Sequence, residues 1–177
     1  MSELWDVYDV NRQRTGKIIE RPSAWGQEAY HLIIHVAIFD GSRRMLIQHR
    51  CHEKHAWADL WDLSAGGSAL AGEESWQAAE REAREELGVR LDLEHVRPHF
   101  SMNYTRGFDD FYTVEMPDLD LAALKLQAAE VDQVRWATLD EVRQMLRDRS
   151  FVPYFPGLIE LLWEVRDNYD GAIRQKI

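Results

Sequence analysis

A crowd of acidic residues bracketed by glycines constrains this chain more than any other feature. It lies in the stretch "GGSALAGEESWQAAEREAREELGV", from Gly66 to Val89. Six glutamates fall within the fourteen residues from Glu73 to Glu86. Like charges three or four residues apart destabilise a helix by roughly 0.2–0.5 kcal/mol per pair. If this stretch is helical, its carboxylates therefore need a counter-charge.

The segment from Glu74 to Leu87 is predicted to be a helix that ends at Gly88. At about 100° per residue, its apolar side chains form one stripe that should face the core. The members of the stripe are Trp76, Ala79, Ala83 and Leu87. Glycine adopts the left-handed conformation with which many helices end, so Gly88 is the expected stop.

Three of the glutamates, Glu82, Glu85 and Glu86, stand at positions i, i+3 and i+4. Relative to Glu82, Glu85 lies at about −60° and Glu86 at about +40°, beside the apolar stripe. Carboxylates at the border of a core are partly desolvated. Oxygen ligands on a rigid helix suit Mg²⁺ or Mn²⁺, which combine one or two carboxylates with waters and substrate phosphates. The alternative is a solvated acidic face balanced by Arg81 and Arg84.

The glycines Gly66 and Gly67 follow a short strand predicted within Ala58–Ser64, at the point where that strand meets a loop. Without side chains, their backbone can come close to a ligand. A plain tight turn explains the same pair equally well.

Strands and helices alternate along the rest of the chain, which favours an α/β fold with a mixed sheet and helices packed on it. Further strands are predicted at Tyr30–Asp40, Met45–Arg50, Val96–Tyr104, Phe108–Met116 and Gln133–Ala137. Further helices are predicted at Leu139–Asp148, with a capping box of Thr138 and Glu141, and through Leu158, Leu161, Leu162 and Val165. The segment Arg14–Lys17 predicts a turn between two extended pieces.

The length of 177 residues is consistent with one domain. We divide it into an extended N-terminal segment (1–28), a core (29–148) and a helical C-terminal segment (149–177). The net charge of −10 argues against binding to a nucleic-acid backbone. A lone cysteine, Cys51, fits a reducing compartment. The sequence shows neither a long apolar run nor a signal peptide, so we expect a cytoplasmic protein that does not bind membranes.

The stretch Gly67–Val89 resembles the Nudix box, G-x5-E-x7-R-E-U-x-E-E-x-G-U, where U is aliphatic. The matching positions are Gly67, Glu73, Arg81, Glu82, Glu85, Glu86, Gly88 and Val89. Ala83 is smaller than the usual aliphatic residue. The order of elements resembles the family from about residue 29 to 148. The resemblance implies an α/β/α sandwich and hydrolysis of the pyrophosphate linkage in a nucleoside diphosphate joined to another group.

The resemblance also implies roles for the matching residues. Glu85 and Glu86 would be the principal ligands of Mg²⁺ or Mn²⁺, and Glu82 a ligand or the general base. Carbonyl groups of Gly66 and Gly67 would complete the metal shell and contact the substrate. A pair formed by Arg81 and Glu73 would hold the helix and its preceding loop in place.

Many members of this family take a further acid from outside the box. Glu130 is our first candidate, and Asp109 and Asp110 are its rivals. Arg50 ends the strand that leads to the site and is expected to steer phosphate. For all of these residues, a purely structural or solvated position is the alternative.

Two other functions compete with hydrolysis. The N-terminal arrangement resembles that of isopentenyl-diphosphate isomerases, which share the fold, but their cysteine position falls on Gly66 and their histidine position on Ser68. A catalytically silent nucleotide-binding domain is the other. The substrate stays open among nucleotide sugars, dinucleotides, ADP-ribose, oxidised nucleotides and prenyl diphosphates. By analogy with the family, we expect a homodimer.

Several other residues have chemistry that a site could use. His31 and His35 are in phase on one strand, so both can face one side, although hydrogen-bonded sheet histidines are the simpler interpretation. As a nucleophile, Cys51 would need a positioned base such as its neighbours His52 and His55, and a packing role is the alternative. His52, Glu53 and His55 could be imagined as a zinc site, but no second cluster with zinc-ligand spacing exists. Three aromatic residues are candidates for stacking on a planar group, with packing as the alternative: Trp57, Phe108 and Tyr112.

Overall fold

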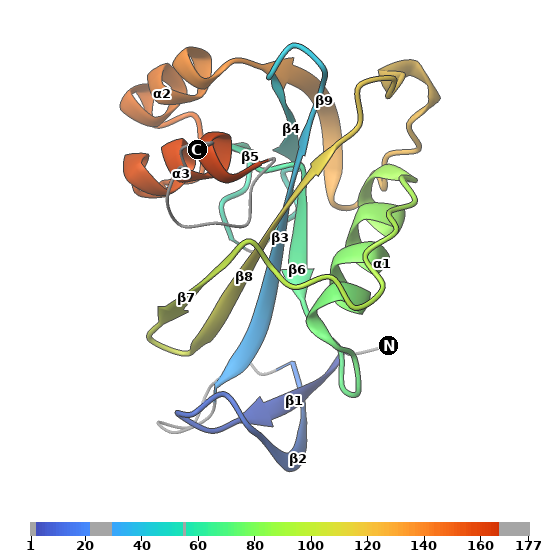
Figure 1. Ribbon diagram of the computed structural model, residues 1–177, viewed down its shortest axis with the longest axis vertical. Coiled ribbons are helices and arrows are strands. Elements are labelled where there is room, and N and C mark those ends of the chain that lie inside the picture. Colours follow the sequence, from blue (N-terminus) through green and yellow to red (C-terminus); the bar gives the residue numbers. More distant parts are fainter. Residues whose placement is uncertain (1–2, 22–29, 55, 167–177) are drawn as a thin grey trace, which may run out of the picture.

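The computed structural model describes residues 3–21, 30–54 and 56–166. Its strands are β1 (Leu4–Tyr8), β2 (Arg14–Glu20), β3 (His31–Phe39), β4 (Met45–Arg50), β5 (Trp61–Asp62), β6 (Ala65–Ser68), β7 (Phe100–Tyr104), β8 (Gly107–Glu115) and β9 (Val131–Ala137). Its helices are α1 (Ser75–Leu87), the short 3₁₀ helix η1 (Leu121–Ala123), α2 (Leu139–Asp148) and α3 (Pro156–Val165). Figure 1 shows the β1–β2 hairpin at one end of the main sheet.

The main sheet has seven strands and is mixed, as predicted. Its main path runs β5-β4-β3-β8-β7, with β6 paired to β3 and β9 paired to β4. Strands β3 and β8 are parallel from His31 opposite Gly107 to Phe39 opposite Glu115, and the other pairings are antiparallel. Beyond the β3–β4 turn, where Phe39 pairs with Met45, these two strands diverge, and β3 continues against β6.

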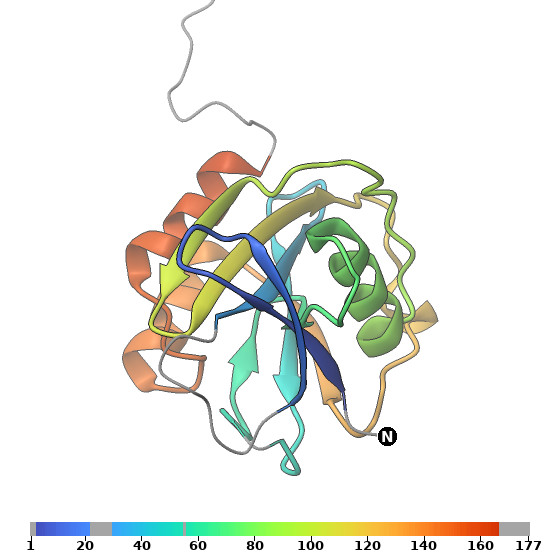
Figure 2. The same ribbon diagram turned by 90° about the horizontal axis from the view of Figure 1, so that it is seen from below.

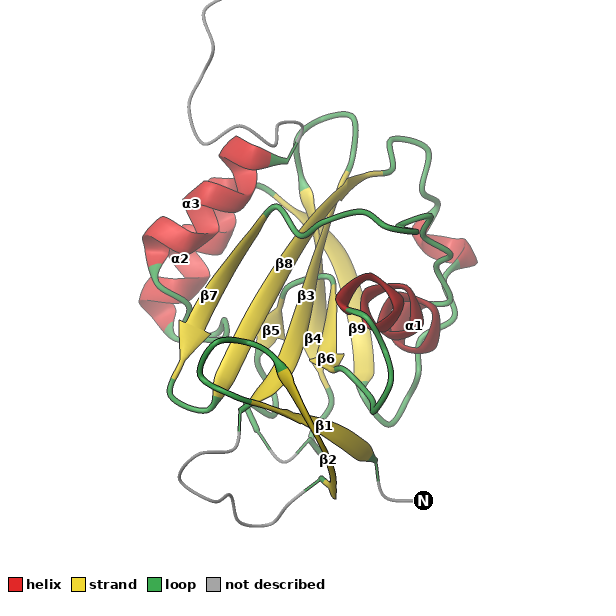
Figure 3. Cartoon of the chain, turned by 60° about the horizontal axis from the view of Figure 1, so that its bottom comes forward, coloured by secondary structure: helices red, strands yellow, loops and turns green. Residues whose placement is uncertain are grey.

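Helices cover both faces of the sheet, so the predicted α/β/α sandwich is confirmed. Helix α1 lies on one face, and α2 and α3 lie on the other (Figures 2 and 3). Strand β3 supplies both cores by alternation: Ile34 and Val36 pack with Ala83 of α1, whereas Ala37 and Phe39 belong to the core under α3. Within the described residues, no helix has both the length and the apolar composition needed to cross a membrane.

Helix α1 forms as its sequence predicts. A capping box joins Glu74 and Gln77 at its start, and Gly88 ends it in the left-handed conformation with φ 72°. Ala79, Ala83 and Leu87 of the predicted stripe are fully buried, and Trp76 packs partly buried against the same core.

The glycine pair lies inside a strand, which corrects one prediction. The strand predicted within Ala58–Ser64 is reduced to β5, and Gly66 and Gly67 lie in β6 rather than in a loop. The Ser64 hydroxyl donates to the carbonyl of Leu46 and accepts from the N–H of Ile38. Ser64 lies between the short strands β5 and β6, and its side chain there makes the kind of hydrogen bonds to β3 and β4 that a strand backbone would make.

The turn predicted at Arg14–Lys17 is wrong. The turn lies earlier, where the carboxylate of Asp9 accepts the N–H groups of Asn11 and Gln13, each at 2.9 Å. This motif is a local side-chain turn that leaves Arg14–Lys17 free to start β2. Gly16 has φ 79° within that strand, a conformation that suits a glycine.

Candidate active site

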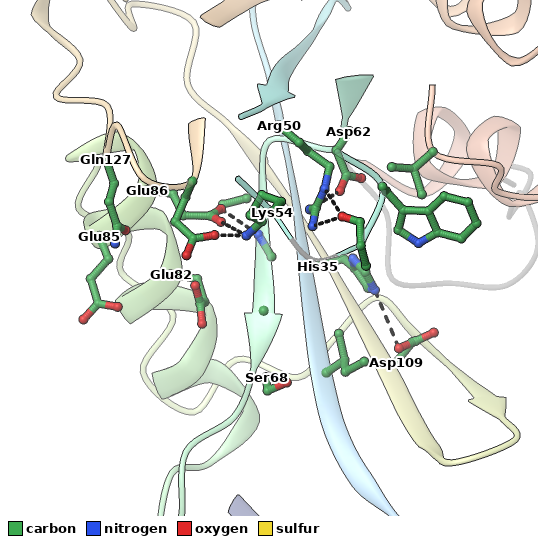
Figure 4. A pocket seen from close by; sticks show the side chains of 18 of the residues that line it. His35, Arg50, Lys54, Asp62, Ser68, Glu82, Glu85, Glu86, Asp109 and Gln127 are labelled. Atoms are coloured by element: carbon green, nitrogen blue, oxygen red, sulfur yellow. Dashed lines mark hydrogen bonds and ion pairs between the residues drawn. The ribbon is translucent and has the colours of Figure 1, made fainter. Parts of the chain in front are cut away.

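A cavity of about 460 Å³ lies between α1 and the ends of the central strands. Its volume is within the range of small-molecule sites. Glu82, Glu85 and Glu86 line one side, and His35 and Asp109 line the opposite side (Figure 4). The site therefore brings together α1, the core strands β3 and β8, and the loop after β4.

Glu86 is the most deeply buried of these carboxylates, with 2% of its surface exposed. Its Oε2 accepts the N–H of Gly66 at 3.0 Å and the Nε2–H of Gln48 at 3.1 Å. Burial, followed by the charge of Glu82, raises the pKa of Glu86 to about 7, against the opposing effects of Lys54 and these donors. A buried carboxylate of this kind favours a cation as its partner.

Glu82 lies against Gly67, and the missing side chain at residue 67 leaves room for its carboxylate. A Cβ at residue 67 would come within 2.6 Å of Glu82 Cδ, closer than real contacts allow. A Cβ at residue 66 would likewise lie 2.9 Å from the carbonyl oxygen of Ile34. Burial raises the pKa of Glu82, and Arg81 opposes the shift. The two glycines thus let α1 carboxylates approach β6 directly.

Arg81 braces the helix against the loop that precedes it. Its guanidinium donates to both oxygens of Glu73, at 2.8 and 3.0 Å, and to the carbonyl of Ser68 at 2.9 Å. It also contacts Glu82 at 2.7 Å and Glu85 at 3.2 Å. Burial alone would lower the pKa of Arg81, but the bonds to Glu73 and Glu82 raise it. The contact expected between Arg81 and Glu73 is therefore present.

The three box glutamates differ in exposure: the Glu85 side chain is 47% exposed and the Glu82 side chain 14%. Among the described residues, no three His, Cys, Asp or Glu side chains converge on a point where they could hold an ion. This does not exclude Mg²⁺, which takes one or two carboxylates and completes its shell with waters and phosphates. The buried carboxylate of Glu86, the close approach at Gly67 and the oxygen-only donor set fit such an ion.

Lys54 supplies a positive charge beside these carboxylates. Its ammonium forms a close ion pair with Glu130 and lies 3.9 Å from Glu86 Oε1. Burial lowers the pKa of Lys54, and the charge of Glu86 opposes that shift. The backbone of Cys51 donates to the carbonyl of Glu130 at 3.0 Å, which ties the Lys54 loop to the start of β9. Glu130 thus lies next to the box glutamates.

Arg50 lines the cavity but is engaged by the protein. It donates to the carbonyl of Ala56, at 3.2 and 3.0 Å, and to Asp62 Oδ2 at 2.9 Å. These bonds hold the loop after β4. As placed here, its guanidinium braces the cavity wall.

Strand alternation separates the rival acids. Asp109 lines the cavity, whereas Asp110 points to the other face of β8 and is fully buried. The Asp110 carboxylate accepts from Arg12, Ser75 and Ser101. Its contacts link the N-terminal hairpin, α1 and β7, so Asp110 holds elements together outside the cavity.

Among the remaining candidates, His35 and Trp57 line the cavity. Trp57 is 53% exposed. His31 stacks on Trp5 with ring centroids 4.6 Å apart, and burial lowers its pKa to about 4. Phe108 and Tyr112 are buried in the core beside α1, where they pack.

Among the described residues, Cys51 and its neighbours form no cluster that could hold a metal ion. The Cys51 thiol is buried and donates to the carbonyl of Ala129 at 2.9 Å. His52 is exposed and pairs with Asp59 at 2.7 Å. His55 lies outside the described residues.

Some residues of the site were not foreseen. Gln48, which holds Glu86, interrupts an apolar strand, and a buried polar residue in such a run is a detectable signal. Lys54, Asp62 and Tyr154 carry no comparable signal, because they reach the cavity from loops and short segments far apart in sequence.

Comparisons with known proteins agree with this geometry. A model of the NUDIX domain matches residues 29–155. The chain is 44% identical over 153 residues to a Nudix hydrolase of Listeria monocytogenes, covering 86% of this chain and 90% of that protein. It is 28% identical over 156 residues to an isopentenyl-diphosphate Delta-isomerase of Pectobacterium atrosepticum, covering 84% and 85%. A crystal structure of a Deinococcus radiodurans protein shares the fold with a TM-score of 0.73 and 20% identity, covering 90% and 98%.

Proposed function

The chain belongs to the Nudix hydrolase family, and on that basis we propose that it hydrolyses the pyrophosphate linkage of a nucleoside diphosphate joined to another group, or of a similar diphosphate. Nudix hydrolases generally use divalent metal ions and act on small-molecule diphosphates. We propose Mg²⁺ or Mn²⁺ for this chain, because the available donors are oxygens.

The observation that carries this proposal is the buried carboxylate of Glu86 in the cavity wall. Among the residues that the structure describes, its partners are an ammonium 3.9 Å away and neutral hydrogen-bond donors. A diphosphate is itself anionic and would be repelled by Glu82 and Glu86. A divalent cation between the two sets of oxygens removes both difficulties.

The proposed roles follow from position. Glu86, Glu85 and Glu82 of α1 would hold the ion, and the carbonyl of Gly66 in β6 would add a further oxygen. A bound divalent ion would neutralise the diphosphate and acidify the attacking water. Glu130 is linked to Glu86 by Lys54, whose ammonium lies near both carboxylates. We propose that Glu130 accepts the proton of that water. Gly66 and Gly67 leave room for the substrate phosphates, and Arg81 with Glu73 holds α1 in register.

An isomerase is the competing enzyme, and similarity to an isopentenyl-diphosphate isomerase favours it. Such an enzyme needs a cysteine that Gly66 and its neighbours do not provide. The one cysteine of the chain, Cys51, is buried with its thiol bonded to Ala129. Hydrolysis therefore has better support from the residues present.

The test separates and quantifies the products of hydrolysis, a nucleoside monophosphate and a phosphorylated partner (or inorganic phosphate from an unsubstituted diphosphate), for a panel of diphosphates with Mg²⁺, Mn²⁺ or EDTA. Wild type is compared with Glu86→Gln and with Glu94→Gln, an exposed carboxylate outside the cavity. We expect metal-dependent hydrolysis that Glu86→Gln abolishes and Glu94→Gln preserves. Diphosphate binding without turnover over the whole panel would identify a silent binding domain, and conversion of isopentenyl diphosphate to its isomer would identify an isomerase.

We also propose that the protein acts in the cytoplasm as a homodimer and does not bind nucleic acid. Exposed apolar side chains are available for contacts between two copies, among them Val10 on the N-terminal turn and Phe155 at the start of α3. Sedimentation velocity of the full chain tests this proposal, since a concentration-independent monomer contradicts it.

A further inference from the structure

We propose that His35 and Asp109 form a specificity subsite for hydrogen-bond donors on the group attached to the diphosphate. This inference rests on the proposed function, because it concerns the same cavity. The proposed subsite predicts that the group attached to the diphosphate carries hydroxyls, as a sugar does, and disfavours a prenyl chain.

The two side chains face the cavity from neighbouring strands. Ile33 pairs with Asp109 and His35 pairs with Phe111 in the parallel β3–β8 ladder, so His35 and Asp109 project from the same face of the sheet. Figure 4 shows them together, on the side of the cavity away from the α1 glutamates. A group attached to a diphosphate at α1 therefore extends toward them.

A chain of hydrogen bonds fixes the orientation of the His35 ring. Arg50 donates to one oxygen of Asp62 at 2.9 Å, and the hydroxyl of Tyr154 donates to the other at 2.8 Å. A phenol has one hydrogen, so the Tyr154 oxygen can only accept from His35 Nδ1, 3.4 Å away. The ring is also stacked on Phe111, with centroids 4.6 Å apart.

This arrangement assigns the hydrogen of a neutral His35 ring to Nδ1. The lone pair on Nε2 then faces Asp109 Oδ1 across 3.6 Å, which exceeds a hydrogen bond. Within the described part of the chain, the Asp109 carboxylate accepts no hydrogen bond, although its side chain is only 23% exposed. Two acceptors thus stand side by side at the cavity wall.

Two adjacent acceptors select a ligand that brings donors. A vicinal diol of a sugar has two O–H groups at a suitable spacing, whereas a prenyl chain has none. A prenyl group would also cover Asp109 without offering it a hydrogen-bond donor, and a site built for hydrogen bonds discriminates strongly against such an analogue. The substrate class that fits is therefore a diphosphate with a hydroxylated substituent.

The experiment compares four compounds with Mg²⁺: ADP-ribose and UDP-glucose, which carry hydroxyl donors, and geranyl diphosphate and inorganic pyrophosphate, which carry no such group. KM and kcat are measured for wild type, Asp109→Asn and Asp118→Asn, an exposed control on the loop after β8. We expect Asp109→Asn to raise KM for at least one hydroxylated compound about tenfold or more, with little change in kcat. Pyrophosphate kinetics and the Asp118→Asn protein should match wild type.

Several results would overturn the inference. These are a wild-type preference for geranyl diphosphate, an equal effect of Asp109→Asn on all compounds, and a fall in kcat with pyrophosphate, which would make Asp109 catalytic. A ¹⁵N spectrum showing His35 doubly protonated would also contradict it, because the ring would then be paired with Asp109. If none of the compounds is hydrolysed, their binding is measured by calorimetry. A hydroxylated compound that binds wild type and binds Asp109→Asn more weakly supports the subsite, although the hydrolase proposal then fails. If neither hydroxylated compound binds, the subsite is overturned.

Discussion

The backbone N–H of Gly66 donates to the carboxylate of Glu86 across 3.0 Å, joining β6 to α1 beneath the cavity. The Glu86 side chain is buried, and burial disfavours the charged form of a carboxylate. The hydrogen bond from Gly66 holds this carboxylate in place there. The stability of the metal-free protein is therefore linked to protonation of that side chain.

Glu86 should make the metal-free protein less stable at higher pH. Its folded-state pKa of about 7 lies above the usual value near 4.3, so its contribution is complete below about pH 4 and is lost as pH rises through 7. Between pH 5 and 8, wild type in EDTA should lose up to about 3 kcal/mol more unfolding free energy than Glu86→Gln. Urea denaturation measures the difference, and identical pH profiles would refute this linkage.

Gly67→Ala should disturb the site without unfolding the protein. The new Cβ would displace the Glu82 carboxylate, which is the far end of a flexible side chain. We expect Mn²⁺ affinity to fall about tenfold or more while the circular dichroism spectrum stays native. Gly157→Ala is the control, because a Cβ there meets no atom within 4 Å. Equal Mn²⁺ affinity in the two variants would contradict the placement of Glu82.

Arg81→Lys should destabilise the fold although the charge is kept. Lysine cannot reproduce the two parallel bonds to Glu73 together with the bond to Ser68. The expected loss is about 2 kcal/mol in thermal or urea unfolding. Arg143→Lys, which alters a surface ion pair with Glu160, should leave stability almost unchanged. If both variants lose the same stability, Arg81 is an ordinary surface arginine.

Lys54→Gln should strengthen metal binding. The ammonium lies 3.9 Å from Glu86 and pairs with Glu130, so it competes with a cation for the same carboxylates. Removing it should tighten Mn²⁺ binding about tenfold, measured by calorimetry, because like charges at this range repel. Lys17→Gln, on an exposed strand, serves as the control. Weaker binding in Lys54→Gln would show that the lysine supports the ion instead.

The parts of the fold that could be predicted are those governed by local sequence. Helix α1 could be predicted because its alanines recur at helical spacing and Gly88 ends it, and strand β4 because it contains a short apolar run. Strand β6 could not be foreseen, since its four residues include two glycines, show no alternation and pair with β3, which is distant in sequence. Its existence depends on tertiary contacts.

The site divides in the same way. Helical spacing places Glu82, Glu85 and Glu86 on one arc, but spacing alone does not reveal that Glu86 is buried and Glu85 half exposed. That difference depends on how α1 lies over β6. The opposite wall joins His35 to Tyr154 across 119 positions of sequence, and no local pattern encodes such a meeting.

Metal binding by α1 is tested most directly by anomalous diffraction from crystals soaked with Mn²⁺ and a slowly hydrolysed diphosphate. We predict a manganese peak about 2.1 Å from a carboxylate oxygen of Glu86, with phosphate oxygens and waters completing the shell. A map in which the diphosphate is bound and no manganese lies beside Glu82, Glu85 or Glu86 would contradict it.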